Sequence, residues 1–287
     1  MKPRSIAVRR MTERVYVAGF LVGIGIALLA LIVLLASILI TAWPRLSPAI
    51  LFNYSNARDP ATAGYAAAIV GTLWVVGLTL LFSLPLGIAA GVYLEEYAGK
   101  GRVSRILQAA VTNLAGVPSV VFGLLGLAVF VRFFGLGPIV LAGALTLTML
   151  VFPYVVITTQ EAIRAVPSSI RDAALALGST KWQAIRRQIL PAASPGLLTA
   201  AILAAARAMG ETAPLLVIGA LFLQTFIPYG PESPFIALPV LIYAYTILPV
   251  DQWGGVAAAG IVVLLGLLFS INAVAIIVRN RLQRQRW

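Results

Sequence analysis

One polar segment in an otherwise apolar chain decides the fold: Ser168-Ser-Ile-Arg-Asp-Ala-Ala-Leu-Ala-Leu-Gly178-Ser-Thr-Lys-Trp-Gln-Ala-Ile-Arg-Arg-Gln-Ile-Leu-Pro191. It carries too many charges to cross a bilayer. Gly178 lies near its middle, where a left-handed helix end costs least. Two pairs fit a capping box, in which a hydroxyl and a carboxyl or amide group satisfy free backbone donors: Ser169 with Asp172, and Thr180 with Gln183. The segment therefore predicts two short helices joined by a glycine bend, which we call the polar hairpin.

Both helices of the polar hairpin are expected to be amphipathic. The first gathers small and apolar residues on one face: Ile170, Ala173, Ala174 and Leu177. The second places Trp182, Ile185 and Ile189 on one face and turns Arg186 and Arg187 away from it. Such a pair would present a surface of small residues to something outside the membrane.

The composition identifies an integral membrane protein. Hydrophobic residues make up 61% of the 287 residues, and the mean hydropathy is +0.99. The chain has no cysteine and no histidine, which excludes disulfides, thiolate nucleophiles, histidine metal sites and histidine proton relays. A net charge of +12 could indicate nucleic acid, but basic residues in the loops of a membrane protein more often set its topology, so we expect no nucleic-acid partner.

The hydropathy pattern predicts an all-α, polytopic membrane protein with six transmembrane helices. The expected spans are residues 17–42, 66–94, 106–131, 139–159, 192–223 and 255–278. The apolar segment 239–249 is too short to cross. We expect an N-terminal tail over 1–16, a transmembrane domain over 17–279 with a loop at 161–191 that contains the polar hairpin, and a C-terminal tail over 280–287.

The basic residues predict the orientation. Six spans place both termini on one side, and 17 of the 21 Lys and Arg residues fall on that side. Three fall on the other side: Arg45, Arg58 and Arg132. Because Lys and Arg concentrate in cytoplasmic loops, the termini and the polar hairpin are expected to be cytoplasmic.

Two spans contain polar features at membrane depth. The third contains Asn113 and the sequence Gly116-Val-Pro-Ser119, which weakens the helix. Irregular backbone at that depth must be buried in protein or line a wet cavity. Ser119 is therefore a candidate lining residue, and Thr146 of the fourth span is another. Pro118 is better explained as a structural kink. Asn113 is either a lining residue or a hydrogen-bonding residue between helices.

The fifth span carries the sequence Arg207-Ala-Met-Gly-Glu211. Arg207 lies roughly 24 Å along a helix from Pro191, deep in the hydrocarbon region. A central arginine costs roughly 2.5 to 3.5 kcal/mol on insertion scales, so it should face the bundle interior, with Glu211 four residues on as its partner. Two readings stay open: an ion pair that holds the fold, and a charged station for an anion.

The chain lacks the residues of an ATPase or a hydrolase. No G-x-x-x-x-G-K-[ST] phosphate loop occurs, and Gly178-Ser-Thr-Lys181 lacks its spacing. No span contains a carboxylate pair. We expect no catalytic residue, no metal site and no cofactor in this chain, so any ATP and Mg²⁺ would be bound by a partner.

The polar hairpin resembles a known signature. Asp172-Ala-Ala-Leu-Ala-Leu-Gly178, followed after nine residues by Gln188-Ile-Leu-Pro191, is similar to the EAA loop of ABC importer permeases, with Asp172 for Glu and Gln188 for Ile. The resemblance implies the type I importer permease fold, with the polar hairpin as a coupling helix pair that docks into a groove of a cytoplasmic ATPase. The residues that would dock are Arg171, Asp172, Ala173, Ala174, Leu177, Gly178, Ser179 and Trp182. The alternative is an amphipathic hairpin that rests on lipid.

Three further motifs resemble the phosphate-importer (PstA-type) branch of this family: Arg207-Ala-Met-Gly-Glu-Thr-Ala-Pro214, Glu161-Ala-Ile-Arg-Ala-Val-Pro167 and Asn113-Leu-Ala-Gly-Val-Pro-Ser-Val-Val-Phe-Gly123. This implies half of a pathway for inorganic phosphate in a bacterial cytoplasmic membrane. The implied partners are a homologous sister permease, two copies of a P-loop ATPase, an extracytoplasmic phosphate-binding protein and lipid. Import of sulfate or molybdate, an ion-gradient-driven carrier or channel, and a membrane scaffold are the alternatives.

Overall fold

The computed structural model describes residues 6–99, 101–220, 226–249 and 252–284. Over these residues the regular structure is helical. The one β-type pairing among them is an isolated bridge between Ile139 and Pro234. Five helices are long and apolar enough to cross a membrane, each alone or with the short helical turns that continue it, and a bent pair supplies a sixth crossing. These five are α1 (Ile6–Ala42), α3 (Ala66–Val92), α6 (Val140–Arg164), α9 (Leu190–Gly210) and α12 (Gln252–Arg284). The predicted all-α, six-span architecture is confirmed.

Shorter elements join and extend these spans. On the side of the α1–α12 junction they are η1 (Trp43–Arg45), α2 (Ala49–Phe52) and α11 (Leu238–Thr246). Next to the opposite end of α3 lie η2 (Tyr93–Tyr97), α7 (Ser168–Ala176), α8 (Lys181–Ala184) and η4 (Ile185–Ile189). The nine residues of α11 agree with the prediction that this apolar segment is too short to cross.

The third span is bent, not straight. It consists of α4 (Arg102–Ala115) and α5 (Ser119–Gly126), and α5 continues into the π-helical turn η3 (Leu127–Phe133). The two halves meet at an angle of 101°. Pro118 lacks a backbone N–H and its ring restricts the preceding residue, so the helix cannot continue through it. The prediction of a weak point at 116–119 is confirmed, and the expected span over 106–131 is divided there into two helices.

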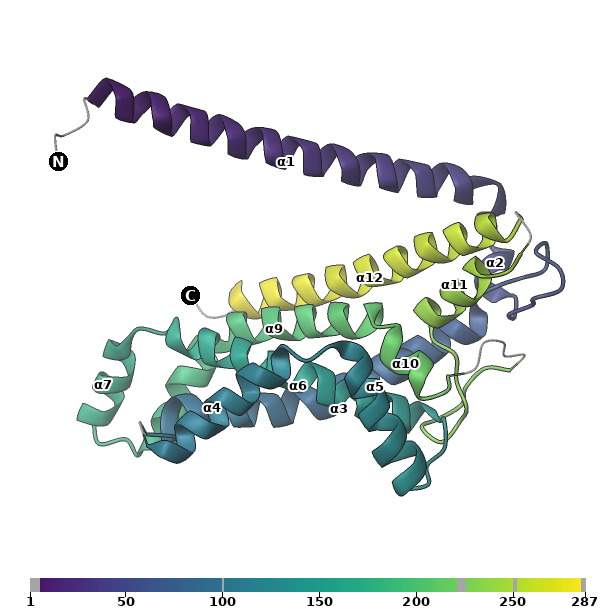
Figure 1. Cartoon of the computed structure of the whole chain (residues 1–287). Helices are drawn as coiled ribbons and strands as arrows, with labels where there is room; N and C mark the ends of the chain where they lie inside the picture. Colours follow the sequence, from purple (N-terminus) through teal and green to yellow (C-terminus); the bar gives the residue numbers. More distant parts are fainter. Residues whose placement is uncertain (1–5, 100, 221–225, 250–251, 285–287) are drawn as a thin grey trace.

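The fifth span is also interrupted. We expected it to run over 192–223, but α9 ends at Gly210 and α10 (Ala213–Val217) follows in a new direction (Figure 1). Pro214 lies in the first turn of α10, where its missing N–H costs nothing. The expected end at residue 223 lies outside the described residues. A Cβ added at Gly123 would lie 2.7 Å from the Cα of Pro214, so α5 and α10 pack closely beside the two breaks.

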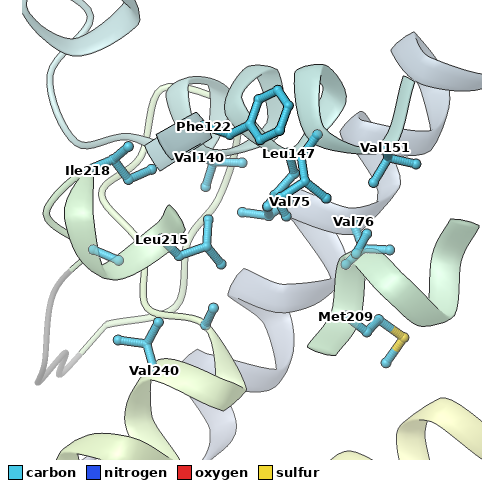
Figure 2. Packing of buried hydrophobic residues seen from close by; sticks show 14 of the residues in the cluster. Val75, Val76, Phe122, Val140, Leu147, Val151, Met209, Leu215, Ile218 and Val240 are labelled. Carbon is cyan, nitrogen blue, oxygen red and sulfur yellow. The ribbon is translucent and has the colours of Figure 1, made fainter. Parts of the chain in front are cut away.

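The core forms where α3 and α6 pack together. Added Cβ atoms at Gly87 and Gly91 would lie 2.6 Å from Cγ1 of Val155 and 2.7 Å from Cβ of Thr159, so no larger residue fits there without movement. Around this contact α5, α9, α10 and α11 complete one apolar cluster (Figure 2), which includes Val75, Val76, Phe122, Leu147, Val151, Met209, Leu215 and Val240. Burial of these side chains holds the broken spans in place.

A second core lies beside the α1–α12 junction. It contains the stacked rings of Tyr245 and Trp253, with Tyr65 against the edge of Tyr245. The Tyr65 hydroxyl donates to the carbonyl of Val256 at 2.9 Å, and the Asn56 N–H donates to the Tyr245 hydroxyl at 3.1 Å. Burial raises the pKa of Tyr245 to about 12, so its hydroxyl stays protonated at neutral pH.

The start of α1, the end of α12 and the polar hairpin lie at the same end of the molecule (Figure 1). This agrees with the expectation of six crossings. Most of α1 diverges from α12 and exposes apolar side chains along its length. Which end faces the cytoplasm stays a prediction from the basic residues.

Candidate functional site

The polar hairpin forms as two short helices joined by a glycine bend. Gly178 has φ = +82°, in the left-handed region that glycine favours. The capping box at Thr180 is complete: the Gln183 N–H donates to the Thr180 hydroxyl at 3.3 Å, and the Thr180 N–H donates to the Gln183 side chain at 2.9 Å. Both predictions are confirmed. The second helix then runs through η4 into α9 as one continuous helical segment, Lys181–Gly210.

The capping box predicted at Ser169 is wrong. Helix α7 begins at Ser168, directly after Pro167, and no side chain caps it. Pro167 stands in an extended conformation and starts the helix by itself, with the Ile170 N–H donating to its carbonyl at 3.1 Å. Ser169 therefore lies inside the first turn, where its hydroxyl cannot serve as the cap.

The buried faces of the polar hairpin differ from the predicted faces. Ala174, Ile185 and Ile189 are buried, and the two isoleucines pack with Val92 and Ile163. Trp182, predicted on the same face, is 53% exposed. A π-helical turn begins at Ile185, so the period of 3.6 residues that the prediction assumed ends there.

The outer surface of the polar hairpin combines small, apolar and charged side chains. Leu177 is 88% exposed, and together with Leu175 and Trp182 it forms the apolar part of this surface. Asp172, Ala173 and Gly178 are also exposed, and Ser179 is half-buried. Six of the eight predicted docking residues therefore reach the surface, while Ala174 is buried and Arg171 is engaged within the chain.

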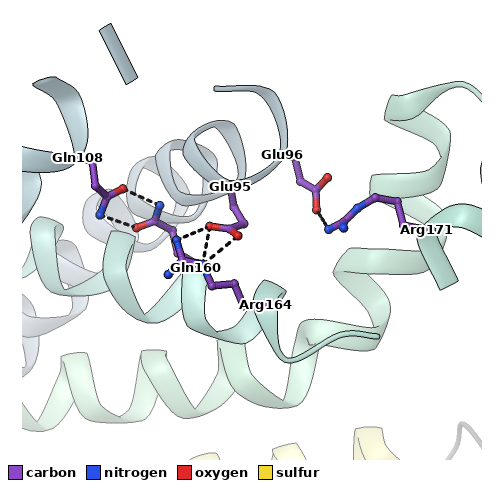
Figure 3. A network of polar contacts seen from close by, with 6 residues as sticks. All are labelled: Glu95, Glu96, Gln108, Gln160, Arg164 and Arg171. Carbon is purple, nitrogen blue, oxygen red and sulfur yellow. Dashed lines mark hydrogen bonds and ion pairs between the residues drawn. The ribbon is translucent and has the colours of Figure 1, made fainter. Parts of the chain in front are cut away.

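Arg171 forms an ion pair with Glu96 of η2 (Figure 3). The Glu96 side chain is only 3% exposed and that of Arg171 is 34% exposed. A second pair joins Glu95 to Arg164, at the base of the polar hairpin. Gln108 of α4 and Gln160 of α6 exchange two amide hydrogen bonds of 2.9 and 3.3 Å nearby. The sequence analysis did not predict these contacts, because no motif or spacing connects Glu95 and Glu96 with their partners.

The second part of the site is Arg207, in the last turn of α9. Its Nε lies 3.7 Å from Oε1 of Glu211, and its guanidinium carbon lies 5.8 Å from the ring centroid of Tyr154. The pair exists as predicted, but Glu211 is not on the same helix face, because it is the extended residue that follows α9. The side chains of Arg207 and Glu211 are 41% and 18% exposed.

The position of Tyr154 along α6 shows how deep in the bundle Arg207 lies. At 1.5 Å per residue, Tyr154 lies about 21 Å along α6 from Val140 and about 15 Å from Arg164. Arg207 therefore lies beside the middle of α6, the span with the largest buried share. The expectation that it lies at membrane depth agrees with this position.

The remaining predicted lining residues, Asn113, Ser119 and Thr146, differ in their exposure. Asn113 is exposed on α4, and Ser119 is half-buried at the start of α5. Thr146 is fully buried, donates its hydroxyl to the Ala142 carbonyl at 2.7 Å and packs against Gly126. Its hydroxyl satisfies its own helix, so Thr146 serves packing and the lining role predicted for it finds no support. The described residues contain no cluster of three or more His, Cys, Asp or Glu that could hold a metal.

Bent spans, a charged residue at mid-depth and a polar two-helix hairpin define a helical transport permease. The comparisons with known proteins agree with this class. Residues 83–283 match the family described as "Binding-protein-dependent transport system inner membrane component", and the chain belongs to this family. It is therefore a multi-pass membrane subunit of a transport system.

Relatives of known name are similar over most of the chain. "Probable ABC transporter permease protein YqgI" of Bacillus subtilis is 33% identical over 72% of this chain and 70% of its own length. "Phosphate transport system permease protein PstA" of Haemophilus influenzae is 34% identical over 77% of this chain and 78% of its own. "Phosphate transport system permease protein PstA 1" of Mycobacterium tuberculosis is 32% identical over 97% and 92%.

Solved structures share the fold. A chain of the MetNI methionine ABC transporter in an inward-facing conformation aligns with a TM-score of 0.63 at 20% identity, covering 76% of this chain and 96% of its own. A chain of the bacterial alginate ABC transporter, solved with its alginate-bound periplasmic protein, aligns with a TM-score of 0.67 at 16% identity, covering 95% and 96%. The expected type I importer permease fold is confirmed.

Proposed function

We propose that this chain is a permease subunit that forms half of the translocation pathway of an ATP-driven importer of inorganic phosphate. The observation that carries the proposal is Arg207, a partly exposed cation at mid-depth of the bundle. The names of the relatives from Haemophilus influenzae and Mycobacterium tuberculosis support phosphate as the substrate.

Arg207 suits an anion that is bound weakly and released. An arginine open to lipid at this depth would cost several kcal/mol, so its exposed face must be covered by a second permease or lie on a wet pathway. A guanidinium has five N–H donors, and Glu211 at 3.7 Å is too distant to satisfy them by hydrogen bonds. Donors therefore remain for an oxyanion. One cation cannot build a tight phosphate cage, so high-affinity capture belongs to a separate binding protein.

The polar hairpin supplies the connection to an ATPase. Leu177 and Trp182 expose large apolar side chains on its outer surface, and burying them in a groove of a protein partner would be more favourable than leaving them in water. We infer two copies of a cytoplasmic P-loop ATPase, which bind ATP and Mg²⁺, a homologous sister permease, and an extracytoplasmic phosphate-binding protein. The basic residues support a cytoplasmic position for the polar hairpin and both termini in a bacterial cytoplasmic membrane.

Movement of the polar hairpin has a continuous helical route to Arg207. The segment from Lys181 to Gly210 is a single run of 30 residues, and Arg207 lies about 39 Å along it from Lys181. ATP binding would close the ATPases, displace the polar hairpin and tilt this segment, so that the pathway opens alternately to the two sides.

The test is reconstitution with the candidate ATPase and sister permease, followed by uptake of labelled phosphate into vesicles. ATP-dependent uptake that excess sulfate and molybdate do not suppress supports the proposal. Uptake of those anions in place of phosphate moves the assignment to another oxyanion, and uptake without the ATPase under an ion gradient contradicts it.

A substitution in the docking surface tests the coupling role. Ala173→Glu adds a bulky charge to an exposed position and should prevent ATPase association or separate ATP hydrolysis from uptake. Normal coupled transport by this variant would contradict docking through the polar hairpin. Arg58→Gln is the matched control, because Arg58 lies on the opposite side in a loop.

A further inference from the structure

Three consecutive residues of η2 each hold one cation of the polar hairpin or its base. Arg164 donates through Nε to both carboxylate oxygens of Glu95 at 2.9 Å, and its Nη2 lies 2.8 Å from Glu95 Oε2. Arg171 donates to Glu96 (Figure 3). The Lys181 ammonium lies 4.9 Å from the ring centroid of Tyr97. These contacts grip the end of α6, the first hairpin helix and the start of the second.

The three contacts differ in strength. Arg164 is 61% exposed, so solvent screens its bidentate pair with Glu95. The Lys181 contact is a single cation–π interaction. Glu96 is almost fully buried, and a buried carboxylate is costly unless it is paired. The pair of Glu96 with Arg171 is therefore the contact that fixes where α7 lies.

Apolar packing accompanies these contacts without replacing them. Val92 at the end of α3 packs with Ile185 and Ile189, and this packing holds the second hairpin helix against the spans. In α7 itself only Ala174 is buried, so apolar packing holds this helix at a single small side chain. A charge-assisted hydrogen bond from Arg171 fixes the angle of α7 because it requires a defined geometry.

We propose that η2 is a positioning clamp that makes the polar hairpin and the end of α3 move as one body. This inference rests on the proposed function. Arg171 is then a positioning residue, which holds α7 toward α3 and does not contact the ATPase. A displacement of the polar hairpin reaches α3 through Glu96, and reaches α6 through the close contacts of Gly87 and Gly91. The route through α9 is thus one of two.

The first test measures the number of ATP molecules hydrolysed per phosphate taken up. Glu96→Gln and Arg171→Gln should each raise this ratio at least threefold, while the ATPase still co-purifies. Glu161→Gln is the matched control, because Glu161 is an exposed carboxylate one turn before Arg164, and its ratio should stay at the wild-type value. An unchanged ratio in Glu96→Gln would overturn the clamp.

A covalent replacement keeps the test valid if the charge variants fold poorly. The chain has no cysteine, so Glu96→Cys combined with Arg171→Cys introduces the sole thiols. Without a cross-link, the double-cysteine variant should hydrolyse more ATP per phosphate taken up than wild type. Bridging the two thiols with a short bifunctional reagent should restore this ratio to within twofold of wild type. If the bridge instead stops uptake, and cleaving it restores uptake, the contact opens during the cycle and the single-body proposal is wrong.

A distance measurement separates failure of the clamp from failure of the proposed substrate. Spin labels at Tyr93→Cys and Leu175→Cys report the distance between η2 and α7, and both positions are exposed. In the assembly with its ATPase this distance should be the same without nucleotide and with ATP trapped, and should change when Glu96→Gln is added. The clamp is overturned if ATP changes the distance in the chain with Glu96 intact, or if Glu96→Gln leaves the distance unchanged. Both outcomes are independent of which anion the vesicles take up.

Discussion

Two of the arginine–carboxylate pairs in the described part of the chain, Arg171–Glu96 and Arg207–Glu211, are opposite in tightness to what their positions suggest. Arg171 and Glu96 lie at the end of the spans, yet they touch, and the carboxylate is buried. Arg207 and Glu211 lie at mid-depth, yet their nearest atoms are 3.7 Å apart and the guanidinium is partly exposed. In a tight pair the guanidinium donates to its carboxylate and stabilises the fold. In a loose pair the guanidinium N–H groups remain able to donate to an anion. The depth of a charge is therefore a poorer guide to its role than the completeness of its pairing.

The largest effect is expected at the tight pair. Arg171→Ala leaves the Glu96 carboxylate buried without a partner and should lower the free energy of unfolding by about 3 kcal/mol. Denaturant unfolding in detergent measures the loss. Arg187→Ala, an exposed arginine of η4, is the control and should change stability by less than about 0.5 kcal/mol. Equal stabilities of the two variants would mean that the Glu96 pair contributes no more than a surface contact.

The loose pair should affect transport more than stability. Arg207→Gln should reduce phosphate uptake by about tenfold, equivalent to about 1.4 kcal/mol, because the anion loses its charge-assisted donor. Glu211→Gln should reduce uptake less, since it leaves that donor in place.

The double variant Arg207→Gln with Glu211→Gln separates the two readings of this pair. An anion station predicts that it transports as poorly as Arg207→Gln alone. If both single variants fail to fold and the double variant transports normally, the pair is structural.

A smaller effect is expected at the cap of the second hairpin helix. Thr180→Ala removes the hydroxyl that accepts from the Gln183 N–H and should cost about 1 kcal/mol. Ser169→Ala is the matched control, because Ser169 caps nothing and should be neutral. Thermal unfolding of the two variants in the same detergent checks the difference. A loss at Ser169 equal to that at Thr180 would contradict the assignment of the cap.

The smallest effect is expected at Thr146. Thr146→Val keeps the shape of the side chain and removes a hydroxyl that serves only its own helix. Phosphate uptake should stay within about twofold of wild type, because Thr146 is buried against Gly126 and its hydrogen bond contributes modestly. A tenfold loss would restore Thr146 as a lining residue.

Local features of the fold were predictable from the sequence, and contacts between distant segments were not. The Arg207–Glu211 pair, the Thr180 capping box and the bend at Gly178 involve residues within four positions, so their spacing predicts them. Glu96 and Arg171 are 75 positions apart, and no spacing rule connects them. A signal was nevertheless present: Glu95 and Glu96 are two of only nine acidic residues, on the side that carries 17 of the 21 basic ones.

The break in the third span was predicted in place but not in extent. Pro118 and Pro214 identify where hydrogen bonding fails, because each lacks an N–H. The sequence could not predict the 101° angle between α4 and α5, since tertiary packing sets it. The hydropathy pattern likewise extends the fifth span to residue 223, because it does not contain the tertiary contacts. In the structure α9 ends at Gly210, and α10 turns to pack against Gly123.

The glycine contacts between α3 and α6 constrain how this bundle can change shape. Side chains from α6 fill the notches at Gly87 and Gly91, so sliding one helix along the other would drive Val155 and Thr159 into backbone. Shear between these two helices is therefore blocked, and they act as a single rigid plate. Opening and closing must occur by rotation of this plate against its neighbours. This rotation can occur at Pro118 and Gly210, where the neighbouring helices are interrupted.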